Sequence, residues 1–176
     1  MPITVMTEET KEITTTNYFL EPGYVVLPAT PTMISVVLGS CVSVCIFDKK
    51  RNVGGVSHFQ FPGTTNPAEA TTRYGNVALM TLIKMMLESG SKAKHLEAQI
   101  FGGAHRKDLS PRNIGEENVR MARRVLARNR ISVTSEDVGG EKGRKIVFAS
   151  HTNEIAVYRA ERLRRSDWYP YTEGRR

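Results

Sequence analysis

A cysteine and a histidine are the two side chains in this sequence best suited to covalent chemistry. Cys41 directly follows the turn-forming residues Gly39 and Ser40, and His58 comes seventeen residues after it near the end of an apolar segment. A thiol beside an imidazole can transfer its proton to the ring, and the resulting thiolate attacks an electrophilic carbon. The pair therefore indicates nucleophilic catalysis.

Two consecutive β-strands, residues 41–47 and 53–59, must bring these groups together. If they form a hairpin with loop 49–50 or loop 48–51, the numbers of opposed residues sum to 99, and Cys41 opposes His58. Directly opposed residues place their Cβ atoms about 4.5–5.5 Å apart on one face. A three-residue loop would instead send the histidine to the other face.

The turn before the cysteine can supply an oxyanion site. Gly39 permits a sharp bend, which leaves the amide N–H groups of Ser40 and Cys41 free to face a developing negative charge. The alternative interpretation is that Cys41 and Cys45 are small buried hydrophobic residues and that His58 is a hydrogen-bonded core residue, since cysteine is commonly buried. Two cysteines are too few for a disulfide framework, and we expect free thiols.

Two other functions fit parts of the sequence. A metal could bind Cys41, Cys45 and His58 together with one of His95, His105 or His151. Structural zinc usually uses a second close pair of ligands, which is missing here. We expect no metal and no cofactor. The formal net charge of +7 and a helix face with Arg120, Arg123, Arg124 and Arg128 suit an acidic partner. No zinc finger, RNP-like or helix-turn-helix pattern is present, so nucleic acid is not the expected partner.

The chain has 176 residues, of which 40% are apolar. This length and composition predict one domain over residues 1–176 without a linker. Residues 1–20 are expected to be a loose lead-in, and residues 159–176 a basic tail. No apolar run is long enough to cross a membrane, and no signal peptide is present, so a cytoplasmic location without membrane insertion is expected. Between the two ends, we predict strands at 24–27, 33–38, 41–47, 53–59, 96–101, 131–136, 145–148 and 154–158, and helices at 72–89 and 114–129.

Several motifs in order carry a family resemblance. The stretch LGSCVSVCIFDKKRNVGGVSHFQFPG (38–63) resembles the signature of the CheD family, the chemoreceptor glutamine deamidases of bacterial chemotaxis. The resemblance continues through RYGNVAL (73–79), EAQIFGGA (97–104), NIGEENV (113–119) and DVGGEKGRKIVF (137–148), and covers roughly residues 20 to 160.

The resemblance implies an α/β fold, a single-domain three-layer α/β sandwich built on mixed and antiparallel β-sheets with two main helices. It also implies hydrolysis of selected receptor glutamines to glutamate, with Cys41 as nucleophile and His58 as general base. The family's third catalytic residue is a threonine six positions before the cysteine. That position is Ser35 here, which keeps the hydroxyl that would orient the imidazole.

The implied partners are methyl-accepting chemoreceptors, as substrates with acidic helices, and a phosphatase of the CheC type. The alternative to an enzyme is a non-catalytic binding module that regulates such a phosphatase. Loss of ammonia release in Cys41→Ala and His58→Ala variants would separate the two hypotheses.

Overall fold

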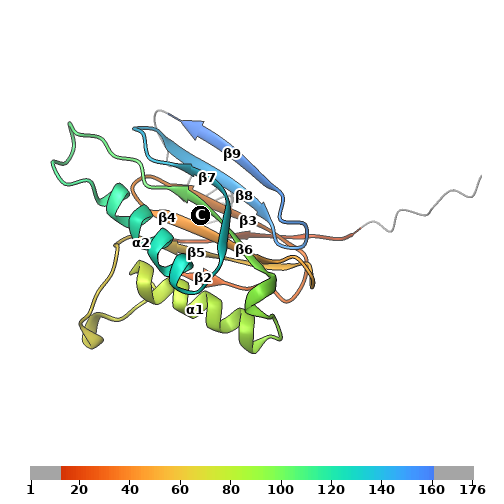
Figure 1. Cartoon of the computed structure of the whole chain (residues 1–176). Helices are drawn as coiled ribbons and strands as arrows, with labels where there is room; N and C mark the ends of the chain where they lie inside the picture. The colour runs from red at the N-terminus through yellow and green to blue at the C-terminus, as the bar shows by residue number, and fades with distance from the viewer. Residues whose placement is uncertain (1–12, 161–176) are drawn as a thin grey trace, which may run out of the picture.

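The computed structural model describes residues 13–160, which form three layers (Figure 1). Two helices lie on one side, a five-stranded sheet lies in the middle, and a four-stranded sheet covers its other face. The predicted three-layer α/β sandwich with two main helices is thus confirmed. In the described residues, neither helix is long and apolar enough to pass through a lipid bilayer.

The middle sheet has the order β2-β5-β4-β6-β7. All its pairs are antiparallel except β6 with β7, which is parallel. Its strands are β2 (Val25–Val26), β4 (Val42–Asp48), β5 (Val53–Phe59), β6 (Leu96–Gly102) and β7 (Ser132–Val138). Every residue of β4 is buried, because this strand is central in the sheet and covered on both faces.

The outer sheet has the order β1-β3-β8-β9. It consists of β1 (Thr16–Phe19), β3 (Thr32–Leu38), β8 (Gly143–Ala149) and β9 (Ile155–Ala160). Strand β1 pairs in parallel with β3, and the other two pairings are antiparallel. The loose lead-in predicted for residues 1–20 is therefore wrong for Thr16–Phe19. Of the predicted basic tail, residues 161–176 lie outside the described residues.

Helices α1 (Gly75–Glu88) and α2 (Ile114–Arg128) cover the outer face of the five-stranded sheet. Short 3-10 helices occur at η1 (Pro67–Glu69) and η2 (Ala93–His95). Asn113 caps α2, because its Oδ1 accepts a hydrogen bond of 2.9 Å from the Glu116 amide, which satisfies one of the free N–H groups at the helix start. One apolar core lies between the helices and the middle sheet, and a second lies between the two sheets.

The β4–β5 hairpin has a register that differs from the prediction. Its loop is residues 49–52, so Asp48 pairs with Val53 and opposed numbers sum to 101 instead of 99. Asp48 stays in the ladder because its Oδ1 accepts hydrogen bonds from the amides of Lys50 (2.9 Å) and Arg51 (3.1 Å). Such bonds from an aspartate to the amides that follow it stabilise a turn. His58 consequently opposes Ser43, and the predicted direct pairing with Cys41 is wrong.

Candidate active site

Cys41 lies at the wall of a cleft of about 670 Å³ at the ends of strands from both sheets. The cleft is bounded by the turn at Gly39–Cys41, the end of β5, the loop of residues 104–114 and the turn before β8. Its apolar lining includes Phe61, Leu109 and Ile114, and its cations are Arg106 and Arg112. Cys41 is partly exposed, whereas Cys45 is fully buried, and both are free thiols. Only the first of the two thiols therefore faces a space that a substrate can enter.

His58 lies behind the cleft, in the layer between the two sheets, with a residue exposure of 1%. Its backbone N–H and C=O bond to Tyr24 and Gly23 on the far side of β5. Ser43 and His58 are therefore a non-hydrogen-bonded pair of the β4–β5 ladder, the kind in which facing side chains come closest. The imidazole projects from the same sheet face as Ser43.

Cys41 and His58 are diagonal neighbours on that face. Cys41 is two residues before Ser43, and like Cys45 and Phe47 it packs against the inter-sheet core. The observed register differs from the predicted one by two residues. Because this number is even, Cys41 and His58 still project from the same face of the sheet, although His58 now opposes Ser43. Diagonal neighbours are about 7–8 Å apart along the sheet, and their Cβ atoms are somewhat closer, within reach of an imidazole ring.

The imidazole is oriented by a backbone carbonyl. His58 Nδ1 lies 3.1 Å from the Leu20 carbonyl oxygen. A carbonyl oxygen can only accept, so Nδ1 carries the proton and donates it. Nε2 is then the basic nitrogen, and it is buried without a hydrogen-bond partner among the residues that the structure describes. This is the tautomer that a general base needs, with its lone pair free.

Ser35 lies in β3, on the strand next to this arrangement but on another face. Its neighbours Ile34 and Val36 point into the inter-sheet core. The alternation of side chains along a strand therefore directs the Ser35 side chain to the outer face of the four-stranded sheet. Among the described residues, its hydroxyl forms no hydrogen bond with His58. Instead, the Ser35 carbonyl accepts a hydrogen bond of 2.9 Å from the amide of Leu20, whose own carbonyl contacts His58.

The turn that carries Cys41 is held in place through its carbonyl groups. Gly103 N–H donates to the Cys41 carbonyl (2.9 Å), and Ala104 N–H donates to the Gly39 carbonyl (3.0 Å). Within residues 13–160, the amide N–H groups of Ser40 and Cys41 donate to no other residue. The two predicted oxyanion donors therefore have no competing partner in another described residue, and the Cys41 N–H approaches only its own thiol.

The close approach in this region occurs at Gly102 and not at Gly39. Gly102 has a φ of +103°, and a Cβ there would lie 2.3 Å from the Cys41 carbonyl oxygen. A Cβ at Gly39 would meet no atom within 4 Å. Gly39 lines the cleft, so its missing side chain leaves room for a substrate. Gly102, in contrast, lets the backbone of β6 approach the turn that carries Cys41, as only a residue without Cβ can.

The buried side chain of Arg144 holds the backbone at Gly102 in place. Arg144 Nε donates to Asp137 Oδ1 (2.9 Å), while its terminal nitrogens donate to the carbonyls of Gly139 (2.7 Å) and Gly102 (3.3 Å). Burial alone would raise the pKa of the Asp137 carboxyl, but hydrogen bonds from Arg159 and Arg144 outweigh it and hold that pKa below its usual value. Hydrogen bonds to the charged form have this effect on any carboxyl. The arginine thus connects β7, β8 and the end of β6, and we call this arrangement the Arg144 clamp.

Burial keeps both members of the Cys–His pair neutral. Loss of hydration raises the pKa of the Cys41 thiol to about 11, although its own backbone amide offsets part of the rise. Loss of hydration also lowers the pKa of His58 to about 4, with the Leu20 carbonyl acting in the opposite direction. In both cases the charged form is the one that burial disfavours. At neutral pH the two groups are thus a thiol and an uncharged imidazole.

Two groups in this site were not predicted. The Leu20 carbonyl carries no residue-type signal, because every residue has a carbonyl. Ser43 opposes His58 directly, and its hydroxyl is buried without a hydrogen-bond partner among the described residues. Its position two residues after the cysteine could have identified it, since alternate residues of a strand share a face.

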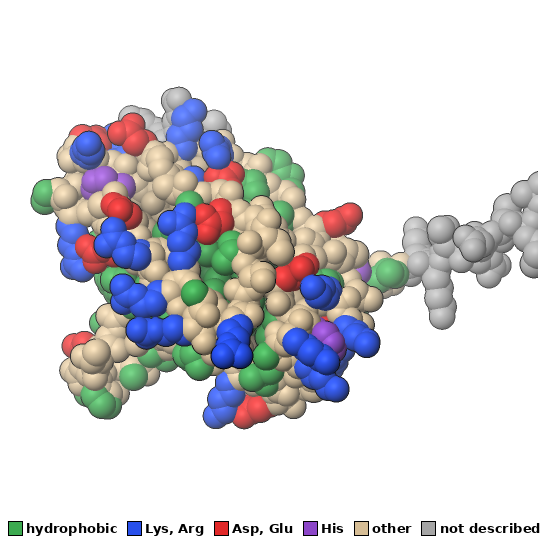
Figure 2. Space-filling view, viewed as in Figure 1, with side chains coloured by type: hydrophobic (Ala, Val, Ile, Leu, Met, Phe, Trp, Pro, Cys, Tyr) green, Lys and Arg blue, Asp and Glu red, His purple; other side chains and the backbone are tan. Residues whose placement is uncertain are grey.

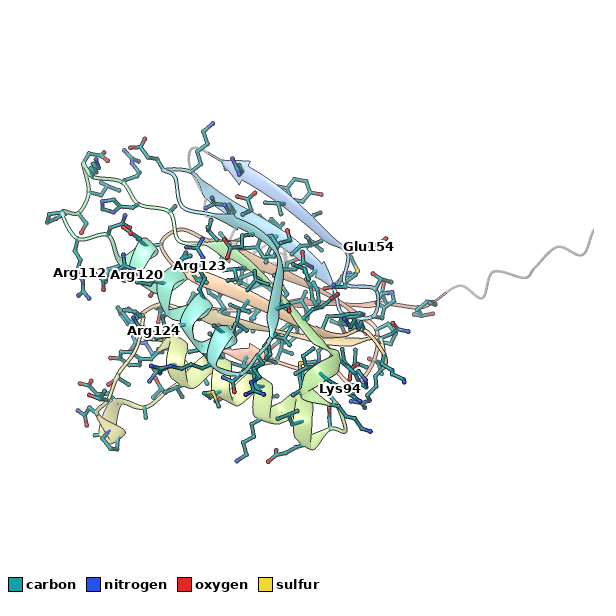
Figure 3. The ribbon with its side chains drawn as sticks, in the orientation of Figure 1. Lys94, Arg112, Arg120, Arg123, Arg124 and Glu154 are labelled. Carbon is teal, nitrogen blue, oxygen red and sulfur yellow. The ribbon has the colours of Figure 1, made fainter. Side chains whose placement is uncertain are left out.

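The surface beside the cleft is basic. Figure 2 shows Lys and Arg side chains gathered over the α2 side of the molecule, and in Figure 3 Arg112, Arg120, Arg123 and Arg124 lie along this side. Arg112, Arg120 and Arg123 are paired with Glu117, Glu116 and Glu136, respectively. Arg124 and Arg128 are exposed and form no ion pair with the described residues. We call these two residues the free arginines of α2.

A comparison with protein families matches residues 60–159 to the CheD family, described as CheD chemotactic sensory transduction. Curated relatives extend the similarity to most of the chain. One from Trichlorobacter lovleyi is 37% identical over 147 residues, 82% of this chain and 91% of its own length. One from Anaeromyxobacter dehalogenans is 41% identical over 142 residues, 80% of this chain and 81% of its own.

A third relative, from Sulfurimonas denitrificans, is 35% identical over 130 residues, 72% of this chain and 83% of its own length. The relatives from Trichlorobacter and Sulfurimonas are both named "Probable chemoreceptor glutamine deamidase CheD". The one from Anaeromyxobacter has the same name with the number 1 added. The similarity thus covers most of the chain that builds the three layers.

Proposed function

Because the chain belongs to the CheD family, we propose that it is a chemoreceptor glutamine deamidase, which hydrolyses the side-chain amide of receptor glutamines to glutamate and releases ammonia. One observation carries the proposal beyond the names of the relatives. A partly exposed thiol faces a cleft, and a buried neutral imidazole lies diagonal to it with Nδ1 held by a carbonyl and with Nε2 unpartnered among the described residues.

The first half-reaction makes a thioester. His58 Nε2 takes the Cys41 thiol proton as sulfur attacks the amide carbon, and the carbonyl electron pair moves onto oxygen. The N–H groups of Ser40 and Cys41 face the resulting oxyanion. When the oxyanion collapses, the C–N bond breaks, and His58 gives its proton to the leaving nitrogen, which departs as ammonia.

The second half-reaction restores the enzyme. Nε2 takes a proton from water, and the resulting hydroxide attacks the thioester carbonyl at the same oxyanion site. The C–S bond then breaks, the sulfur recovers the proton from His58, and the glutamate side chain leaves. The Leu20 carbonyl stabilises the imidazolium that exists between these transfers, and the Ser35 carbonyl holds Leu20 in place. Ser35 thereby keeps a supporting role, through its backbone.

The experiment is a deamidation assay on a purified cytoplasmic chemoreceptor fragment with glutamine at its modifiable positions. Ammonia release and the mass of receptor peptides are followed. Cys41→Ala and His58→Ala should abolish the reaction while the fold is retained, and Cys45→Ala is the matched control, because that thiol is buried away from the cleft. Absence of ammonia release by the wild type would overturn the proposal and favour a binding module.

We also propose that the free arginines of α2 attract the acidic receptor helices. Complementary charge mainly raises the association rate and is screened by salt. Reversal of both charges (Arg124→Glu with Arg128→Glu) should lower kcat/KM at low salt and flatten its salt dependence. Lys94→Glu is the control, because this exposed lysine does not belong to α2 and lies apart from Arg124 in Figure 3. A salt dependence equal to that of the wild type in the double variant would contradict the idea.

A further inference from the structure

We propose that Asn118 is a positioning residue for this reaction, which holds the Ser40–Cys41 peptide so that the Cys41 N–H faces the oxyanion. This inference rests on the proposed deamidase function. Asn118 lies in α2, is fully buried, and does not line the cleft. It therefore acts from behind the nucleophile turn.

The side chain of Asn118 connects the two segments that carry the catalytic pair. Its Nδ2 donates to the Ser40 carbonyl at 2.9 Å and to the Gln60 carbonyl at 3.0 Å. Ser40 directly precedes the nucleophile, and Gln60 follows His58 by two residues. Both amide hydrogens of Asn118 are thereby used, and both partners are acceptors, so the carboxamide cannot be turned round.

The same orientation leaves Asn118 Oδ1 buried without a hydrogen-bond partner among residues 13–160. A buried acceptor without a partner is costly, and the few such groups in native structures call for an explanation. If Asn118 served stability alone, a side chain that satisfies all its polar atoms would serve better. The unpaired oxygen is consistent with a residue retained for the two carbonyls that it holds.

The geometry of the peptide bond explains how the contact between Asn118 and the Ser40 carbonyl sets the direction of the Cys41 N–H. The Ser40 C=O and the Cys41 N–H belong to one planar trans peptide unit, so they point in opposite directions. Asn118 holds the C=O on the α2 side, and the N–H is thus directed away from α2. With Gly103 and Ala104 holding the carbonyls on either side, all three carbonyls of the turn are anchored, while the N–H groups of Ser40 and Cys41 donate to no other described residue.

The test separates oxyanion stabilisation from the reactivity of the thiol. Amide hydrolysis needs the oxyanion donors, whereas alkylation of Cys41 by iodoacetamide is a displacement at a saturated carbon and forms no oxyanion. Asn118→Ala and the isosteric Asn118→Asp should each lower kcat on the receptor fragment by about tenfold to a hundredfold. KM and the alkylation rate of Cys41 should stay within about twofold, since neither depends on the peptide's N–H direction.

The Asn118→Asp variant adds a second measurement, the pH dependence of kcat, which a purely structural role of Asn118 would not change. A protonated carboxyl regains one O–H donor for the two carbonyls, so kcat relative to the wild type should recover as the pH is lowered. If the alanine variant does not fold, judged by its thermal unfolding, the aspartate variant decides. Asn76→Ala is the matched control, because this α1 asparagine also holds a loop carbonyl, that of Thr64, without touching the nucleophile turn.

Two results would overturn the inference. An unchanged kcat in folded Asn118 variants would show that the peptide needs no such support. Equal losses of kcat and of the alkylation rate would show that the substitution disrupts the whole site. Failure of the proposed function itself is distinct, because it appears as a wild type that releases no ammonia.

Discussion

His58 Nδ1 lies 3.1 Å from the carbonyl oxygen of Leu20, a residue thirty-eight positions earlier in the chain. The contact fixes which nitrogen carries the proton, and it leaves the free lone pair on Nε2. It also ties the His58 ring to the segment between β1 and β2, so the chain next to the outer sheet helps to position a side chain of the middle sheet.

The ring of His58 should exist at pH 7 as the neutral Nδ1–H tautomer. A backbone carbonyl can only accept, so the proton must lie on Nδ1. Nitrogen-15 chemical shifts of the ring in a long-range proton–nitrogen spectrum distinguish the two nitrogens. A protonated Nε2 at pH 7 would contradict the assignment, and a His58→Ala sample identifies the signals.

The acid limb of the pH–rate profile should lie near pH 4. Burial lowers the pKa of His58 to about 4, so the base remains unprotonated well below the ordinary histidine value of 6.5. Because kcat/KM reports ionisations of the free enzyme, it should stay nearly constant from pH 7 down to about 5. A midpoint near 6.5 in the deamidation assay would argue that the ring is solvated.

Stability should fall between pH 6.5 and pH 4 because of the same histidine. The unfolded chain binds a proton at His58 below pH 6.5, whereas the folded protein does so only below about 4. Stability is thus full above 6.5 and lost as the pH falls toward 4, by roughly 3 kcal/mol for this group. Urea unfolding as a function of pH should show a weaker decline in His58→Gln, and equal slopes would refute the assignment.

The two glycines Gly39 and Gly102, which lie beside Cys41, should respond in different ways to substitution by alanine. At Gly102 the methyl group would meet the Cys41 carbonyl, in a backbone region that alanine rarely adopts. Gly102→Ala should therefore impair activity and lower the free energy of unfolding by about 2 kcal/mol or more. At Gly39 the methyl group would project into the cleft, where a substrate would bind. Gly39→Ala should therefore raise KM and change the free energy of unfolding by less than about 0.5 kcal/mol. Chemical denaturation and steady-state kinetics measure the two effects, and equal destabilisation by both variants would contradict this assignment.

The Arg144 clamp should be far more important for stability than its exposed neighbour. Arg144→Leu leaves Asp137 without its buried partner, and the loss should be about 3–5 kcal/mol. Arg159 is the second partner of Asp137, and its side chain is 59% exposed. Because solvent screens such a pair, Arg159→Leu should cost at most about 1 kcal/mol. Similar losses in both variants, measured by urea unfolding, would show that the two arginines do not differ in this way.

Much of the architecture was predictable because it depends on side-chain periodicity. The α1 pattern predicted Leu79, Leu82 and Met86 as buried, and α2 likewise buries Val119 and Leu126. The sheet face shared by the cysteine and the histidine was also predictable, since a hairpin with an even-numbered loop keeps them on one side. The two-residue register shift was not, because it depends on the aspartate carboxylate that caps the loop amides.

The supports of the site were harder to foresee. The residues of strand β1 are mostly exposed, and the strand forms because it pairs with β3. Its sequence therefore has no hydrophobic pattern from which a strand could be predicted. Leu20 acts through its carbonyl, which has no residue-type signature. Ser35 was assigned from the family resemblance, and only the alternation along β3 reveals that its hydroxyl faces away from the ring.

The packing of α2 has a mechanical consequence. A Cβ on Gly115 would lie 2.3 Å from the Gly103 carbonyl oxygen, so the first turn of the helix rests directly on the backbone that donates to Cys41. Because a side chain at Gly115 would not fit between these two backbones, we expect a shift of α2 to displace the Gly103 amide that donates to the Cys41 carbonyl. A partner that displaces α2 from its outer surface would therefore also displace the backbone of Cys41.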